Sequence, residues 1–261
     1  MKEKLVELYK CRELLYALVN RDISIRYKQS IMGILWAILM PILILLSGVV
    51  VRYALAVASG KPIQMADIAS VAVKSLPWAF FVSAVRFGCN SLSYNVNLVT
   101  KVYFPKEIFP VAAVLASLFD CLVAAGGLLI VLLALRVGWS VYLLWIPVLV
   151  LSLVILVTGI DLIVSAASLF FRDVKYIVEV ILTFGVFFTP VFYEIRMLGR
   201  YGKWLLLNPL SPIVDGLASC VARHQSPSVI WVAYSFALGL TALIGGYAFF
   251  KHLEPAFAES I

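Results

Sequence analysis

The stretch "IMGILWAILMPILILLSGVVV", residues 31–51, decides the fold class of this chain. It holds 21 residues and no charged side chain. An α-helix rises about 1.5 Å per residue, so about 20 apolar residues are enough to cross the hydrocarbon layer of a membrane. The apolar residues run continuously and do not alternate with polar ones, as they would in a membrane β-strand. The stretch therefore predicts a transmembrane helix.

The whole chain has the composition of an integral membrane protein. Of its 261 residues, 63% are hydrophobic and only 13% are charged, and the mean hydropathy of +1.03 is too high for a soluble core. A secretory signal would lie nearer the start and be shorter, so we expect the first span to remain in the mature protein. We predict an all-α membrane protein, a single domain over residues 1–261, with six transmembrane helices at about 31–51, 75–97, 108–135, 141–171, 176–193 and 229–250.

The distribution of Lys and Arg predicts the orientation. Cytoplasmic loops of membrane proteins carry an excess of these residues. Segments 1–31, 94–107, 171–175 and 251–261 together hold twelve of the 21. The opposite loops hold seven: Lys61, Lys74, Arg136, Arg196, Arg200, Lys203 and Arg223. The count predicts a multi-pass protein with both termini in the cytoplasm.

Residues 1–20 predict an amphipathic helix before the first span. Apolar residues recur there at steps of three and four, at Leu5, Leu8, Cys11, Leu15 and Leu18. The segment is too polar to cross a membrane, which fits a helix lying in the cytoplasmic interface. A small soluble cap helix is the alternative.

Residues 196–222 form an apolar segment that is too short and too broken to span. The sequence "NPLSP", residues 208–212, interrupts it. Backbone that is not continuously helical is tolerated at membrane depth when it is buried in protein or lines a cavity. We predict two short re-entrant helices from the outer face, with an ordinary folded outer loop as the alternative.

Four charged residues fall inside the predicted spans: Arg86, Asp120, Asp161 and Glu179. A charge at the centre of a membrane helix costs about 2.5 to 3.5 kcal/mol on insertion scales, so each should face protein or water. They form either a proton relay or substrate contacts, or else a structural pair such as Arg86 with Asp120 or a helix end near the headgroups.

Aromatic residues in the second and fifth spans are candidates for a channel lining. They offer flat faces to sugar rings, although many membrane aromatics fill space or anchor a helix at the interface. The candidates are Trp78, Phe81, Phe187, Phe188 and Tyr193.

Motifs for independent chemistry are missing. The sequence "GRYGKW", residues 199–204, lacks the spacing of a phosphate-binding P-loop. His224 and His252 have no Cys or acidic partner at metal-ligand spacing, and no nucleophile motif is present. We expect no catalytic residue, metal site or cofactor in this chain, no nucleic-acid partner, and no ATP hydrolysis by the chain alone.

The segment after the second span, residues 98–107, has the character of a docking loop. It is short and cytoplasmic in the predicted topology, and it places Val102, Tyr103 and Phe104 beside charged residues. Apolar residues on a water-facing loop indicate a binding surface, and Pro105 restricts the backbone there.

Four blocks of sequence carry a family resemblance. They are "NRDISIRYKQSIMGILWAILMP" (20–41), "NLVTKVYFPKEIFP" (97–110), "FFRDVKYIVEVILTFGVFFTPVFY" (170–193) and "LLLNPLSPIVDGL" (205–217). In this order and spacing they resemble the membrane subunit of type 2 ABC exporters, above all the branch that exports O-antigen, capsule and teichoic acid. Asp161 departs from that family's pattern, because small or apolar residues are common at its position.

The resemblance implies a homodimer in the bacterial inner membrane that binds two copies of a separate cytoplasmic ATPase, which holds the ATP and Mg. The dimer would enclose a channel for a lipid-linked glycan. Residues 98–107 match the family's coupling helix. The residues implied as ATPase contacts are Tyr103, Phe104, Pro105, Lys106 and Glu107.

The resemblance also assigns a role to the stretch before the first span, with Arg21, Asp22, Arg26 and Tyr27 at a cytoplasmic entrance. Arg21, Arg26 and Lys28 are positioned for anionic headgroups, where Lys and Arg contribute about 1 kcal/mol each, and Asp22 is able to pair with any of the three. We expect a lipid-linked head group to meet Arg21 and Arg26. A plain positive-inside anchor also explains the cations.

The sequence therefore predicts the membrane subunit of an ATP-driven exporter of lipid-linked polysaccharide. One alternative keeps the family and changes the cargo to a drug, a peptide or another small molecule. A second alternative is a proton-coupled carrier that uses Asp161 or Glu179. A membrane glycosyltransferase is disfavoured, because no Asp-x-Asp metal-binding motif is present.

Overall fold

The computed structural model of the protein describes residues 11–28, 30–60, 64–101, 104–134, 138 and 140–259. These residues form helices and contain no strand, which confirms the all-α prediction. The α-helices are α2 (Arg12–Tyr27), α3 (Leu35–Ser59), α4 (Met65–Asn90), α5 (Val96–Lys101), α6 (Ile108–Ala134), α7 (Ile146–Phe170), α8 (Asp173–Gly185), α9 (Gly202–Leu205), α10 (Leu210–Val221) and α11 (Val229–Leu253). The 3₁₀ turns are η1 (Ser93–Asn95), η2 (Val141–Trp145), η3 (Val186–Phe188), η4 (Ile195–Tyr201) and η5 (Glu254–Glu259).

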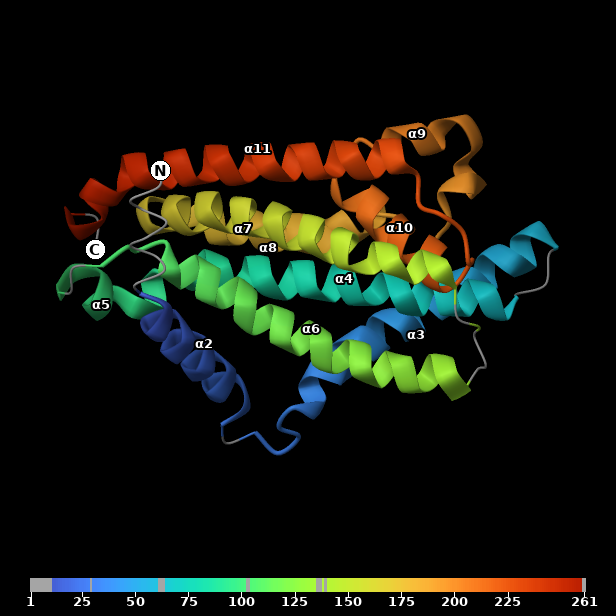
Figure 1. The fold of residues 1–261 in the computed structure, drawn as a ribbon, viewed down its shortest axis with the longest axis horizontal. Coiled ribbons are helices and arrows are strands. Elements are labelled where there is room, and N and C mark those ends of the chain that lie inside the picture. Colours follow the sequence, from blue (N-terminus) through green and yellow to red (C-terminus); the bar gives the residue numbers. More distant parts are fainter. Residues whose placement is uncertain are drawn as a thin grey trace.

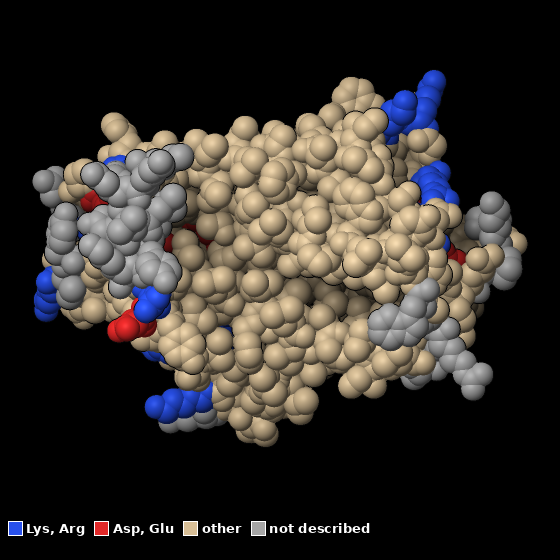
Figure 2. All heavy atoms as spheres, in the orientation of Figure 1, with Lys and Arg blue, Asp and Glu red and all other residues tan. Residues whose placement is uncertain are grey.

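The described part of the chain contains five helical stretches that are long and apolar enough to cross a membrane. They are Leu35–Ala58, Met65–Asn90, Ile108–Ile130, Val141–Phe170 and Val229–Phe257. Lys, Arg, Asp and Glu gather towards the two ends of the face drawn in Figure 2, and its broad middle is uncharged. The protein is a multi-pass membrane protein.

The second span begins earlier than predicted. Helix α4 starts at Met65, where Gln64 and Asp67 form a capping box, so the predicted start at residue 75 is ten residues late. The prediction places Lys74 in an outer loop, whereas in the structure Lys74 lies fully buried within α4. A charge does not end a helix when a buried carboxylate neutralises it.

The predicted fifth span, residues 176–193, is not a continuous helix. Helix α8 has 13 residues, a length of about 20 Å, and η3 follows it. Thr189 is then extended, with φ −119° and ψ 134°, because a residue that precedes proline avoids the helical region. The prediction of six continuous transmembrane helices is therefore not confirmed.

The broken fifth segment nevertheless runs along most of α4. At one end, Lys175 Nζ donates to Ser93 Oγ at 3.2 Å. At the other end, Lys74 Nζ donates to the carbonyl oxygen of Tyr193 at 3.1 Å. Helix α4 rises about 24 Å between residues 74 and 90. The segment thus crosses most of the bundle as a short helix, a 3₁₀ turn and a stretch of turns and bends.

The long helices α4, α7 and α11 lie side by side, and α6 crosses α4 obliquely (Figure 1). Helices α7 and α11 approach closely at Gly159, where a Cβ atom would lie 2.5 Å from the backbone of Ala242. Small residues allow such close approach of membrane helices. Helices α2 and α5 and the C-terminal turn η5 lie at one end of the bundle, and α9 and α10 lie towards the other (Figure 1).

The two predicted accessory segments both contain helices where they are described. Residues 1–10 lie outside the described residues, and α2 continues to Tyr27, beyond the predicted end at residue 20. It packs against α6 and buries Leu18. Helices α9 and α10 occupy the segment 196–222, with α10 buried against α4 and α7. Their position relative to a membrane surface stays a prediction.

Candidate functional site

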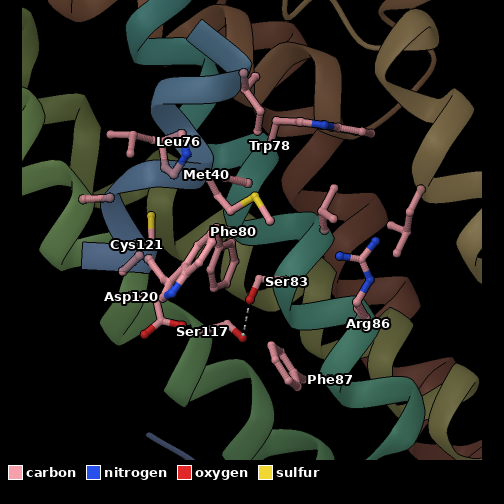
Figure 3. Close-up of a pocket in the computed structure, with 18 of the residues that line it drawn as sticks. Met40, Leu76, Trp78, Phe80, Ser83, Arg86, Phe87, Ser117, Asp120 and Cys121 are labelled. Atoms are coloured by element: carbon pink, nitrogen blue, oxygen red, sulfur yellow. Dashed lines mark hydrogen bonds between the residues drawn. The ribbon is translucent and has the colours of Figure 1, made fainter. Parts of the chain in front are cut away.

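A cavity of about 600 Å³ opens between α2, α3, α4, α6 and α8. Figure 3 shows Met40, Leu76 and Trp78 towards one end of this cavity. Asp120, Ser117, Ser83 and Arg86 lie towards the other end (Figure 3). The cavity therefore joins an apolar region to a polar one that carries charge.

Asp120 on α6 is the centre of the polar end. Its carboxylate accepts hydrogen bonds from Arg26 Nη1 and from Tyr27 Oη, both at 2.5 Å. Arg26 also donates to Ser117 Oγ at 3.1 Å and lies 3.8 Å above the ring of Phe87. These contacts fix the end of α2 on α6. Burial, and then the hydrogen bond to Asp120, raise the pKa of Tyr27, so its hydroxyl remains a donor.

Arg86 and Glu179 form a second ion pair at the same end. Arg86 Nε donates to Glu179 Oε1 at 2.7 Å, and Nη2 donates to Oε2 at 2.8 Å. The alternative of a structural pair between Arg86 and Asp120 is therefore wrong, because each residue has another partner. Both side chains of the Arg86–Glu179 pair are nearly half exposed in the protomer, at 43% and 48%. Arg86 lines the cavity, one helical turn before α4 ends.

The four predicted entrance residues divide into two pairs. Arg26 and Tyr27 line the cavity, whereas Arg21 and Asp22 are not among its lining residues. Arg21 Nη2 pairs with Asp22 at 2.7 Å, and Nη1 donates to Asn95 Oδ1, also at 2.7 Å. Arg21 therefore ties α2 to the turn that precedes α5.

The predicted aromatic lining is only partly at the cavity. Trp78 lines it, and Phe81 packs against Trp78 with ring centroids 5.6 Å apart. Phe187 and Phe188 are exposed, and Tyr193 Oη donates to the carbonyl oxygen of Phe187 at 2.7 Å. Phe81, Phe187, Phe188 and Tyr193 do not line this cavity, whereas Trp36, Phe80, Phe87 and Phe192 do. No periodicity in the sequence distinguished these two groups.

The predicted docking segment is anchored from within. Tyr103 lies outside the described residues. Phe104 packs edge-on against Phe109 with centroids 5.5 Å apart, and Lys106 Nζ lies 5.6 Å from the centroid of the Phe257 ring. Glu107 is only 3% exposed, and its Oε2 lies 2.8 Å from Lys251 Nζ. Glu107 thus points into the protein, while Pro105 and Lys106 are partly exposed.

Asp161 on α7 lies outside the cavity. It is fully buried against Gly88 of α4, and neither carboxylate oxygen has a hydrogen-bond partner among the described residues. A Cβ atom at residue 88 would collide with this carboxylate. The glycine therefore makes room for Asp161 between the two helices.

Sequence reasoning missed a buried network of charges towards the other end of the bundle, which we call the outer ion network: Arg52, Lys74, Glu194, Asp215 and Arg223. Glu194 Oε1 lies 2.8 Å from Arg52 Nη2 and 2.9 Å from Lys74 Nζ. Glu194 Oε2 lies 2.8 Å from Arg223 Nη1, and Asp215 Oδ1 lies 2.8 Å from Arg223 Nη2. The network joins α3, α4, α10 and the chain after α8.

Glu194 is the central acid of the outer ion network. Burial alone would raise its pKa, but Lys74, the hydroxyl of Ser70 and Arg223 together lower the pKa to about 2. Arg52 and Lys74 interrupt apolar runs in the sequence, which is the only signal that they carry. Their acidic partner lies more than one hundred residues further along the chain.

Comparison with known proteins adds to this geometry. The family model described as "ABC-2 type transporter" matches residues 13–221. The chain is 29% identical over 263 residues to the O-antigen export system permease protein RfbA of Myxococcus xanthus, covering 98% of each chain. It is 26% and 24% identical to two proteins of the same name from Klebsiella pneumoniae, over 95% of this chain and 94% of each relative.

The match to the family model covers most of the chain, and the relatives align with nearly all of it. The matched residues include those of the cavity, the docking segment and the outer ion network except Arg223. The resemblance seen in the four sequence blocks is therefore confirmed. This multi-pass membrane protein belongs to the ABC-2 type transporter family.

Proposed function

We propose that this chain is the membrane subunit of an ATP-driven exporter that moves a lipid-linked polysaccharide across the bacterial inner membrane. The observation that carries the proposal is the cavity, which has apolar walls and two arginines at one end, in a chain that is similar over nearly its full length to permeases named for O-antigen export.

The chemistry of the cavity suits such a cargo. A lipid-linked glycan joins a long apolar tail to an anionic head group. Met40, Ile44 and Trp78 offer the tail an apolar surface. Arg26 and Arg86 offer guanidinium groups, which match phosphate oxygens in a bidentate geometry. In the structure, Asp120 pairs with Arg26 and Glu179 pairs with Arg86. The anionic head group enters by taking the place of these two carboxylates beside the arginines.

Energy for transport comes from a separate ATPase in this proposal. The sequence has no P-loop, so two copies of a partner chain bind the ATP and Mg. They dock on residues 98–107, with Tyr103, Phe104, Pro105 and Lys106 as contacts. Glu107 is buried and paired with Lys251, so we assign it to holding the segment in place rather than to touching the ATPase.

A homodimer completes the channel. Only 11% of the residues in an 18-residue apolar stretch of α3 are buried within the protomer. Helix α8 and η3 expose Phe184, Phe187 and Phe188. Such apolar faces on a membrane protein contact lipid or a second copy. We propose that two copies meet around the cavity side, with both termini in the cytoplasm and with α9 and α10 re-entering from the outer face.

The test is transport by the reconstituted complex. Proteoliposomes that contain this chain and its ATPase should move a lipid-linked glycan in an ATP-dependent way, and a deletion strain should accumulate that glycan on the inner side, detectable by mass spectrometry. Accumulation of a drug or peptide instead would assign the small-molecule alternative and overturn the glycan proposal.

The proton-coupled alternative gains no support from the geometry. Neither Asp161 nor Glu179 lines the cavity, and Glu179 is paired with Arg86. Transport by the chain alone, driven by a pH gradient and indifferent to ATP, would contradict the proposed function.

A further inference from the structure

The C-terminal turn η5 is packed into the end of the bundle that carries the docking segment. Phe257 is fully buried. Its ring centroid lies 5.2 Å from that of Phe250 on α11 and 6.0 Å from that of Phe170 at the end of α7. These rings belong to an apolar core that also includes Val99 of α5 and Phe109 of α6.

Polar contacts reinforce the same junction. Lys251 Nζ on α11 lies 2.8 Å from Glu107 Oε2 and 2.7 Å from Glu254 Oε2. Lys106 Nζ lies above the ring of Phe257, 5.6 Å from its centroid. Two consecutive residues of the docking segment are therefore held by the C-terminal end of the chain, one through charge and one through an aromatic ring.

Helix α11, whose C-terminal end contacts the docking segment, is closely packed against α7. Helices α7 and α11 meet through Gly159 and Gly246, where a Cβ atom on either residue would collide with the backbone of the other helix. A displacement that reaches α11 through Lys251 is therefore passed to α7 with little loss, because tightly packed elements transmit strain.

We propose that Lys251, Glu254 and Phe257 form a C-terminal brace. The brace positions the described residues of the docking segment, 98–101 and 104–107, against α7 and α11, so that movement of the docking segment reaches the spans. The inference rests on the proposed function. Residues 251–257 lie beyond the part of the chain that the family model matches, residues 13–221.

The chemistry of the brace favours positioning over stability alone. A buried ion pair is weak evidence for stability, because apolar residues of similar volume often serve as well. Buried polar pairs in other proteins fix register between elements. In the brace, the pair connects Glu107 to Lys251, which are 144 residues apart in the sequence, and it sets where the docking segment meets α11.

The experiment measures export per ATP hydrolysed in the purified complex of the full chain with its ATPase. The variants are Phe257→Ala and Lys251→Met, with Phe257→Leu and Lys251→Arg as conservative counterparts. His252→Ala is the matched control, because His252 is exposed and lies next to Lys251 in the chain.

We expect Phe257→Ala and Lys251→Met to retain the ATPase rate within about twofold and to lose about two- to thirtyfold in export per ATP, the range that mutations along coupling networks span. Phe257→Leu, Lys251→Arg and His252→Ala should keep the wild-type ratio. If Phe257→Ala does not assemble, the double variant Glu107→Gln/Lys251→Met decides the question, because it removes the ion pair without leaving a buried charge unpaired.

Two results would overturn the brace. One is an unchanged export per ATP in Lys251→Met. The other is a parallel fall of hydrolysis, export and thermal stability in every variant, which would mean that the turn only supports folding. Failure of the proposed function gives a different result, because the wild-type chain would then recover no ATPase and export no glycan.

Discussion

Nζ of Lys74, which is fully buried in α4, lies 2.9 Å from Oε1 of Glu194, 120 residues further along the chain. This contact holds the chain after α8 against α4 at a point where no regular secondary structure supports it. The same carboxylate also binds Arg52 and Arg223. One glutamate thus organises the end of the bundle that carries α9 and α10.

Replacing this glutamate should be the most damaging change in the outer ion network. Glu194→Gln leaves Arg52, Lys74 and Arg223 without their shared carboxylate, and removing one partner of a buried pair costs about 3 to 5 kcal/mol. Lys74→Met should cost less, because Glu194 keeps both arginines. Thermal unfolding of the purified protein in detergent measures the difference. Arg200→Gln is an exposed control, and equal losses in Glu194→Gln and Arg200→Gln would contradict the central role of Glu194.

The low pKa of Glu194 predicts a dependence of stability on pH. A carboxyl group whose folded-state pKa is depressed stabilises the protein above its unfolded pKa and loses that contribution as pH falls. The ordinary pKa of glutamate is about 4.3, and in the folded protein it is lowered to about 2. The melting temperature should therefore fall between about pH 4.5 and pH 2, with a smaller slope in Glu194→Gln. An identical slope in both proteins would assign the effect to other carboxylates.

The lining of the cavity predicts unequal roles for Arg21 and Arg26, which both lie on α2. Arg26→Gln removes a guanidinium that lines the cavity, whereas Arg21→Gln removes one that contacts Asp22 and Asn95 outside it. Hydrogen bonds to charged groups contribute about 1.5 to 3 kcal/mol, so Arg26→Gln should raise the half-saturating glycan concentration by about tenfold or more. Export assays in proteoliposomes measure it. Arg21→Gln should have the smaller effect, and a reversed order would exclude the cavity as the entrance.

Replacing side chains of the docking segment by alanine should weaken binding of the ATPase. Phe104→Ala and Lys106→Ala should each reduce the amount of ATPase that copurifies with this chain, and the amount of glycan on the cell surface should fall as well. Both substitutions remove a side chain from the proposed docking surface. Copurification with the tagged ATPase, normalised to the amount of this chain in the membrane, measures the effect. His252→Ala, at the same end of the bundle, should not alter it. Normal copurification in both truncated variants would place the docking surface elsewhere.

Substitutions at Gly88 and Asp161 should partly compensate for each other in their effect on stability. Gly88→Ala places a methyl group where the carboxylate of Asp161 lies, and overpacking of this kind costs about 1 to 3 kcal/mol. In the double variant Gly88→Ala/Asp161→Ala the obstructing atoms are absent, so the loss should be smaller than the sum of the two single losses. Thermal unfolding in detergent provides the comparison. Additive losses would show that the two residues do not obstruct one another.

The charged residues show where prediction from sequence ended. Arg86 and Asp120 are a cation and an acid in adjacent predicted spans, so the sequence suggests that they pair. In the structure, Tyr27 and Arg26 reach Asp120 from α2, and Glu179 reaches Arg86 from α8. The choice depends on where α2 and α8 lie on the bundle, and no local pattern specifies that position.

The sequence by itself determined the fold class and the family. Apolar runs of about 20 residues satisfy their backbone hydrogen bonds in a membrane only as helices or closed barrels, and these runs lack the alternation of barrel strands. The four ordered blocks then identified the family. Only the tertiary structure decided the partners of the ion pairs, the burial of Lys74 within α4 and which aromatic side chains line the cavity. These features depend on contacts between residues far apart in the chain, such as Lys74 with Glu194, which neutralise charges that sequence reasoning assigns to loops.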